Sequence, residues 1–182
     1  MAKFASGKRL RSHRFNHSSD PRTIRGLSTV GKNRVDETLS NVILIVDDQP
    51  NDLEALTRAL RKFDVENPIL CLNDGDEAIR YYNGTGKYSD RSKYPLPSIL
   101  FLDLKLRTVS GWEVLDWIHG LGMKQKSNIF VYTQLSTVNE VHRLYNLGAD
   151  SFIHKPVQED DLTNLIRHFP NFWAITQPPL AR

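Results

Sequence analysis

The sequence has few of the features that mark secreted or membrane-embedded proteins. It holds one cysteine, Cys71, so no disulfide forms within the chain and a reducing cytoplasm is the expected setting. No apolar run approaches the roughly 18 residues of a membrane-spanning helix, and the basic start is not followed by the apolar stretch of a secretory signal. These absences predict a cytoplasmic protein without a membrane span. Cys71 itself lies inside an apolar run, 69–72, and is expected to be a small core residue.

Acidic residues are scarce at the start of the chain. Residues 1–40 hold nine Lys or Arg and three Asp or Glu, a net charge of +6, which leaves −3 for the remainder of a chain whose total is +3. The segment is rich in Arg, Ser, Gly and Asn and shows no apolar periodicity, which predicts a disordered basic tail. A solvated leader is the simplest interpretation. An electrostatic arm for nucleic acid or an anionic surface, and an organelle transit peptide, are the alternatives.

From residue 41 onward, short apolar strands alternate with helical patterns. Five strands are predicted, at 42–46, 69–72, 99–102, 129–132 and 152–153, and a helix is predicted after each. This alternation indicates an α/β fold with a parallel sheet covered on both faces. The folded domain is expected over 41–170, followed by a C-terminal tail over 171–182. A polar loop at 83–97 is long for a connection of this kind.

Polar residues follow four of the predicted strands. Asp47 and Asp48 come after the first strand, Asp103 after the third, Thr133 after the fourth and Lys155 after the fifth. Because parallel strands all end at the same edge of a sheet, these side chains are expected to meet in one cleft. Taken singly, an aspartate or threonine here is often only a helix cap and a lysine only a solvated charge. Their joint arrival favours a functional site.

Three clustered carboxylates repel one another unless a cation neutralises them. A hard divalent cation such as Mg²⁺ does so with oxygen ligands and also bridges to phosphoryl oxygens. A carboxylate beside such an ion can attack a phosphoryl donor and form an acyl phosphate, while a lysine stabilises the charge on the phosphoryl oxygens. The residue types at the sheet edge therefore predict reversible phosphoryl transfer.

These residues, in this order and at these spacings, resemble the receiver domain of two-component response regulators. The resemblance covers residues 41–170 and implies a flavodoxin-like, doubly wound, five-stranded parallel sheet of order 2-1-3-4-5. The pieces that carry it are Val-Ile-Leu-Ile-Val-Asp47-Asp48, Ile-Leu-Phe-Leu-Asp103, Val-Tyr-Thr133, Gly148-Ala-Asp-Ser-Phe152 and His-Lys155-Pro156.

The resemblance implies a phosphoacceptor and a metal site. Asp103 would accept the phosphoryl group. Asp48, Asp103 and the backbone carbonyl of Lys105 would bind Mg²⁺ or Mn²⁺, with Asp47 assisting directly or through a water molecule.

The resemblance also implies a switch. Thr133 would be the switch hydroxyl, and Phe152 the aromatic side chain whose rotamer follows it, although alone Phe152 is more simply a core residue. Lys155 would bind the phosphoryl group, and the peptide bond between Lys155 and Pro156 would be cis.

Some positions indicate a subgroup of receivers, and others differ from what receivers commonly have. The long loop and the ending Phe172-Trp173…Gln177-Pro178-Pro179 are similar to stand-alone receivers that partner bacterial sensor kinases, including phytochrome-like ones. Receivers commonly have Pro where this chain has Arg107, and a small residue where it has Gln134. Lys105 adds a further cation near the site. These departures bear on the kinetics of phosphorylation, because the amide of Gln134 could obstruct access to Asp103.

The predicted function is that of a single-domain response regulator. It would accept a phosphoryl group from a sensor histidine kinase or phosphotransfer protein and signal to a downstream protein by contact, because few residues remain after 170 for an output domain. A homodimer and weak nucleic-acid binding by the basic tail are lesser expectations. The alternative is a receiver-like scaffold that works without phosphorylation. A phosphohydrolase of the haloacid dehalogenase type would need an acid where Lys105 stands, so no enzyme activity is expected beyond slow self-phosphorylation and self-dephosphorylation.

Overall fold

The computed structural model describes residues 41–122, 127–134 and 137–175. The predicted disordered tail at 1–40 and the last residues, 176–182, lie outside this part of the chain. Strands and helices alternate along the described residues in the order β1 (Ile43–Val46), α2 (Pro50–Lys62), β2 (Ile69–Leu72), α3 (Gly75–Asn83), β3 (Ile99–Leu102), α4 (Gly111–Gly120), β4 (Asn128–Thr133), α5 (Val138–Asn146), β5 (Ser151–His154) and α6 (Glu159–His168). Two 3₁₀ helices, η1 (Gly86–Tyr88) and η3 (Pro170–Phe172), complete it.

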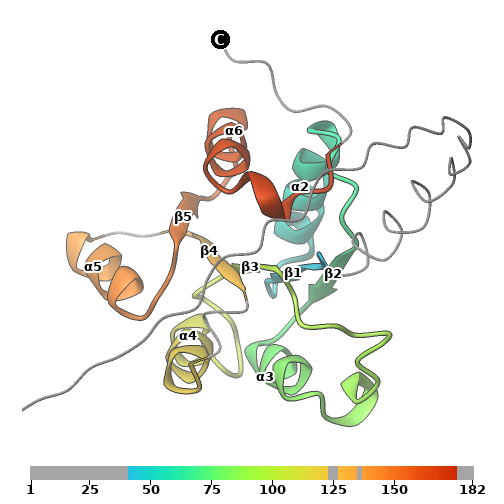
Figure 1. Cartoon of the computed structure of the whole chain (residues 1–182). Coiled ribbons are helices and arrows are strands. Elements are labelled where there is room, and N and C mark those ends of the chain that lie inside the picture. Colours follow the sequence, from blue (N-terminus) through green and yellow to red (C-terminus); the bar gives the residue numbers. More distant parts are fainter. Residues whose placement is uncertain (1–40, 123–126, 135–136, 176–182) are drawn as a thin grey trace, which may run out of the picture.

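The strands form one five-stranded parallel sheet of order β2-β1-β3-β4-β5. Helices α2 and α6 lie on one side of it and α3 and α4 on the other (Figure 1). The predicted flavodoxin-like fold is confirmed. No helix in the described residues is long and apolar enough to cross a membrane.

The helices begin where the sequence offers capping groups. The side chain of Asp74 accepts a hydrogen bond from the backbone of Asp76 at the start of α3. Ser110 and Glu113 form a reciprocal capping box at the start of α4. Pro50 is the first residue of α2, a position where a backbone N–H would have no hydrogen-bond partner within the helix, so proline's lack of one costs nothing. These caps fix where each helix leaves the edge of the sheet.

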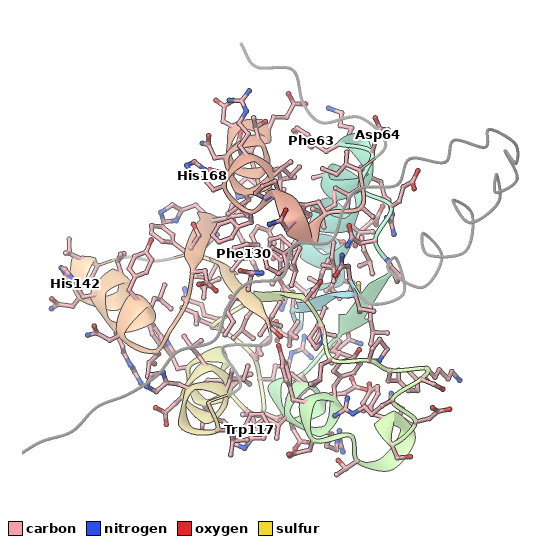
Figure 2. The ribbon with its side chains drawn as sticks, in the orientation of Figure 1. Phe63, Asp64, Trp117, Phe130, His142 and His168 are labelled. Carbon is pink, nitrogen blue, oxygen red and sulfur yellow. The ribbon has the colours of Figure 1, made fainter. Side chains whose placement is uncertain are left out.

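Two apolar layers flank the sheet. The first lies between the sheet and α3, α4 and α5, and includes Leu100, Leu115 and Leu144. The second lies between the sheet and α2 and α6, where Phe130 is fully buried at the centre of the layer (Figure 2). Full burial stabilises the fold by about 1.5–3 kcal/mol for each large apolar side chain. The central strands are therefore held rigidly from both sides.

The long connection predicted at 83–97 is packed rather than open. Tyr88 in η1 is buried, with its ring 5.0 Å from that of Tyr81 and 5.1 Å from that of Tyr94. The guanidinium group of Arg91 donates to the backbone carbonyls of Tyr82 and Tyr94, at 2.5 and 3.1 Å. An aromatic cluster and one arginine thus hold this loop against α3.

The prediction that Cys71 is a core residue is wrong. Its side chain is exposed. The apolar run around it forms β2, which lies at the edge of the sheet and, among the described residues, pairs with β1 alone. An edge strand is covered less completely than a central one, so an apolar run there does not guarantee burial.

The packed part of the chain continues past residue 170, where the sequence placed the end of the domain. Trp173 is buried, and its ring stacks on that of Phe130 at 6.3 Å with an interplanar angle of 8°. Ile175 forms an antiparallel bridge with Val65. Phe172, Trp173 and Ile175 thus pack on the apolar layer that α6 also covers.

Candidate functional site

The carboxyl ends of the strands bring the predicted polar residues together. Asp47 and Asp48 directly follow β1, and Asp103 follows β3, its backbone N–H donating to the carbonyl of Val46 at 2.9 Å. Thr133 is the last residue of β4, and Lys155 follows β5. Parallel pairing keeps these strand ends level, so the side chains meet at one edge of the sheet.

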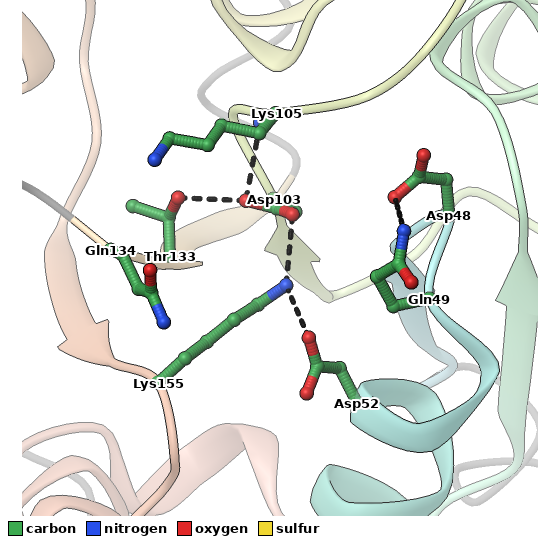
Figure 3. Close-up of a pocket in the computed structure, with 8 residues that line it drawn as sticks. All are labelled: Asp48, Gln49, Asp52, Asp103, Lys105, Thr133, Gln134 and Lys155. Atoms are coloured by element: carbon green, nitrogen blue, oxygen red, sulfur yellow. Dashed lines mark hydrogen bonds and ion pairs between the residues drawn. The ribbon is translucent and has the colours of Figure 1, made fainter.

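Asp103 is the centre of this arrangement (Figure 3). Its Oδ1 accepts hydrogen bonds from the hydroxyl of Thr133 at 2.7 Å and from the backbone N–H of Lys105 at 3.2 Å. Its Oδ2 lies 2.8 Å from Nζ of Lys155. Only 5% of the residue is exposed. The carboxylate is thus held by charged and polar groups on both of its oxygens.

The ammonium group of Lys155 contacts three carboxylates. Its Nζ lies 2.6 Å from Asp47, 2.9 Å from Asp52 and 2.8 Å from Asp103. Burial lowers the pKa of Lys155, but the hydrogen bonds to Asp103, Asp47 and Asp52 outweigh it and leave the pKa raised. Lys155 therefore stays charged, and its three N–H donors are matched by three acceptors.

Asp52 is the member of this group that sequence reasoning missed. It lies in the first turn of α2, four residues after Asp48, and its side chain is one-third exposed. The only signal in the sequence was an acidic residue in the first turn of a helix that starts at the sheet edge, which alone is a common stabilising feature.

Asp47 and Asp48 have different surroundings. Asp47 is fully buried, and burial raises its pKa in spite of the hydrogen bonds from Lys155 and from the backbone of Gln49. Asp48 accepts a hydrogen bond at Oδ1 from the side-chain amide of Gln49, at 3.0 Å, and contacts Nε of Arg107 at Oδ2, at 2.8 Å. Sequence reasoning identified Arg107 as a departure from the receiver pattern but not as the partner of Asp48.

The acidic cluster suits a hard divalent cation. Oxygen atoms of Asp47, Asp48 and Asp103 all lie within 4.8 Å of one another. Oxygen ligands at this spacing match the preference of Mg²⁺ or Mn²⁺. With Asp52, the cluster holds four carboxylates, and among the described residues Lys155 and Arg107 form ion pairs with them, while Lys105 also lines the pocket. Four acids against these three cations leave the immediate cluster with an excess of negative charge.

A pocket of about 260 Å³ opens over Asp103. It is lined by Asp48, Gln49, Asp52, Asp103, Lys105, Thr133, Gln134 and Lys155. Gln134, the bulky residue at a position where receivers commonly have a small one, lines this pocket beside Thr133 and Lys155 (Figure 3).

Three residues of the predicted set do not line this pocket: Asp47, Phe152 and Pro156. Phe152 packs in β5 with its ring 6.5 Å from that of Tyr145 and 5.3 Å from that of His154. The peptide bond between Lys155 and Pro156 is cis.

Comparison with known proteins assigns the chain to a family. Residues 43–167 match the response regulator receiver domain. The chain belongs to the response regulator receiver family. Receivers are the phosphoacceptor modules of two-component signalling, they are generally not enzymes, and they bind a divalent metal at an acidic pocket of this kind.

Solved receivers with similar structures include phytochrome-associated ones, as the sequence predicted. The bacteriophytochrome response regulator AtBRR is 34% identical, with a TM-score of 0.65, over 75% of this chain and 97% of that one. The Mn²⁺-bound form of the response regulator Rcp1 is 25% identical, with a TM-score of 0.61, over 77% of this chain and 99% of that one.

Curated relatives include the probable methanogenesis regulatory protein FilR2 of Methanothrix harundinacea (strain 6Ac). It is 27% identical over 135 residues, which are 72% of this chain and 83% of FilR2. Other curated relatives are longer, and this receiver spans 13% to 54% of their length.

Proposed function

We propose that this receiver is a single-domain response regulator that accepts a phosphoryl group on Asp103 from a sensor histidine kinase or a phosphotransfer protein. The observation that carries the proposal is the environment of one carboxylate. Asp103 lies 2.7 Å from a hydroxyl and 2.8 Å from an ammonium group, beside two further acids and below an open pocket. This is the set of groups that formation of an acyl phosphate needs.

In the proposed reaction an oxygen of Asp103 attacks the phosphorus of a phosphohistidine. The bond between phosphorus and nitrogen breaks, its electron pair stays on the imidazole nitrogen, and a mixed anhydride forms on Asp103. Lys155 exchanges its contact with Oδ2 of Asp103 for one with a phosphoryl oxygen, which spreads the charge of the transferred group.

Mg²⁺ or Mn²⁺ is the proposed cofactor, held by Asp48, Asp103 and the backbone carbonyl of Lys105, with Asp47 in direct or water-mediated support. When bound, the ion neutralises part of the negative charge on the carboxylates and the phosphoryl oxygens. The excess of acid in the cluster supports this assignment.

The proposed output is a shift between two conformations. The hydroxyl of Thr133 leaves Oδ1 of Asp103 and donates to a phosphoryl oxygen, and Phe152 changes rotamer as Thr133 moves. Phe152 packs against Tyr145 on the exposed face of α5, so a downstream protein or a second copy of the chain would meet a changed surface. A cytoplasmic setting is part of this proposal, and binding of nucleic acid is not.

A scaffold that works without phosphorylation is the second candidate. The ion pair between Arg107 and Asp48 favours it, because this pair engages a carboxylate that the metal site needs.

The intact mass of the full chain, measured after incubation with Mg²⁺ and phosphoramidate, separates the two candidates. The regulator gains the mass of one phosphoryl group, loses the gain in EDTA, and shows none in Asp103→Asn. A wild-type chain that gains no mass from phosphoramidate, acetyl phosphate or a sensor histidine kinase would instead support the scaffold.

A further inference from the structure

The contact between Arg107 and Asp48 joins the loop after β3 to the loop after β1. Nε of Arg107 lies 2.8 Å from Oδ2 of Asp48. The Arg107 side chain is 74% exposed, whereas that of Asp48 is 7% exposed. Arg107 therefore reaches in from solvent and covers the carboxylate from its open side.

Both oxygens of Asp48 are engaged in this structure. Oδ1 accepts from the amide of Gln49 and Oδ2 from Arg107. A guanidinium group keeps its charge at any ordinary pH. A divalent cation bound to Asp48 would meet this positive charge at close range, where two like charges repel.

The buried cation of the site, Lys155, pairs with other acids than Asp48. Lys155 contacts Asp47, Asp52 and Asp103, and its side chain is almost fully buried. Lys155 thus pairs with Asp47, Asp52 and Asp103, whereas Arg107 pairs with Asp48. Because Arg107 is exposed, it can move into solvent without disturbing the contacts of Lys155.

We propose that Arg107 competes with the divalent cation for Asp48. Arg107 holds this carboxylate in the metal-free protein, and it must release Asp48 when the cation binds. Metal binding is then an exchange of one cation for another. This inference rests on the proposed function, because it concerns the metal site assigned there.

Titration with Mn²⁺ tests the exchange directly. The electron paramagnetic resonance signal of free Mn²⁺ measures binding without reference to phosphorylation. We expect Arg107→Ala to bind Mn²⁺ about two- to fivefold more tightly than wild type, the range set by the energies of ion pairs with one exposed partner. Arg107→Lys, which keeps the charge, is expected to stay within about twofold of wild type.

Arg58→Ala is the matched control. It removes the same charge from an equally exposed arginine that is paired with Glu54 on α2. Its affinity for Mn²⁺ should equal that of wild type. An equal gain in Arg58→Ala would assign the effect to net charge and overturn the competition.

The Nε–H resonance of Arg107 gives a second test in the unaltered protein. The signal, assigned by its loss in Arg107→Ala, should exchange slowly with water without metal and faster once Mg²⁺ is added. The competition, but not the metal site, would be overturned by unchanged or weaker Mn²⁺ binding in Arg107→Ala. An Nε–H signal whose exchange with water does not change when Mg²⁺ is added would have the same meaning. Failure of the wild-type chain to bind Mn²⁺ would overturn both the competition and the proposed metal site.

Discussion

A Cβ atom on Gly111 would lie 2.0 Å from the backbone carbonyl oxygen of Asp103. The same Cβ would lie 2.7 Å from the Cα atom of Leu104. The backbone N–H of Gly111 donates to the carbonyl of Leu104 at 3.1 Å. The start of α4 is therefore pressed directly against the backbone that carries Asp103. Only hydrogen fits in this space.

We predict that Gly111→Ala lowers the free energy of unfolding by about 1–3 kcal/mol, because a rigid backbone must move to admit the methyl group. Gly120 at the other end of α4 has nothing within 4 Å, so Gly120→Ala should be neutral or more stable by up to about 1 kcal/mol. Urea denaturation of both variants measures the difference. Equal stabilities would contradict the close contact.

Replacing Thr133 by Val tests the hydrogen bond to Asp103. The hydroxyl is buried and donates at 2.7 Å to a carboxylate, and a bond to a charged group is worth about 1.5–3 kcal/mol. Thr133→Val should lose about that much free energy of unfolding. Thr133→Ser keeps the hydroxyl and should lose about 1 kcal/mol or less. A Val variant as stable as wild type would show that the bond contributes nothing.

Asp52 holds Lys155 from the side opposite Asp103. We predict that Asp52→Asn raises the rate of modification by phosphoramidate about two- to fivefold, because Lys155 loses a competing carboxylate and the pocket loses a negative charge that repels the donor. Asp116→Asn, on the exposed face of α4, should leave the rate unchanged. The rate follows from intact mass against time. A slower Asp52→Asn would instead make Asp52 a residue that positions Lys155.

Alkaline pH should destabilise the receiver through Tyr81. Burial raises the pKa of Tyr81 to about 12, from a usual value of 10.0. The folded state therefore keeps a proton that the unfolded state releases above pH 10, and stability falls as pH rises from about 10 to about 12. Lys155, whose pKa is also raised, adds a loss that begins above 10.5.

The phenol of Tyr81 also donates to the carbonyl of Pro95 at 2.6 Å. Tyr81→Phe should accordingly be less stable than wild type at pH 8 and yet lose less stability between pH 8 and pH 11, as read from urea midpoints. Tyr145→Phe, at an exposed position, is the control and should follow wild type. Parallel curves for Tyr81→Phe and wild type would rule out this tyrosine as the source.

The sequence predicted the parts of the site that depend on strand order alone. Apolar runs marked the strands, and parallel pairing then brought Asp103, Thr133 and Lys155 together at one edge. The contact of Asp52 depends instead on the rotation of α2 about its axis, and that of Arg107 on the path of the loop after β3. No pattern of apolar residues in the sequence predicts that rotation or that path.

Burial at the edges of the fold was harder to predict. Cys71 lies in an apolar run, but its strand is the outer one, so its exposure follows from sheet order rather than from local composition. Trp173 follows the last helix without any pattern of its own, and only the shape of the layer around Phe130 shows that it is buried.

The order of the strands that end at the pocket also sets when this cluster of side chains is assembled in a newly made chain. The hydroxyl of Thr133 comes 30 residues after Asp103, and the ammonium group of Lys155 comes 52 residues after it. A chain still on the ribosome therefore carries its acids long before it carries the lysine that balances them. Lys155 can contact Asp103 only after β5 has left the ribosome and paired with β4, so the cluster is assembled late, after all of its carboxylates have been synthesised.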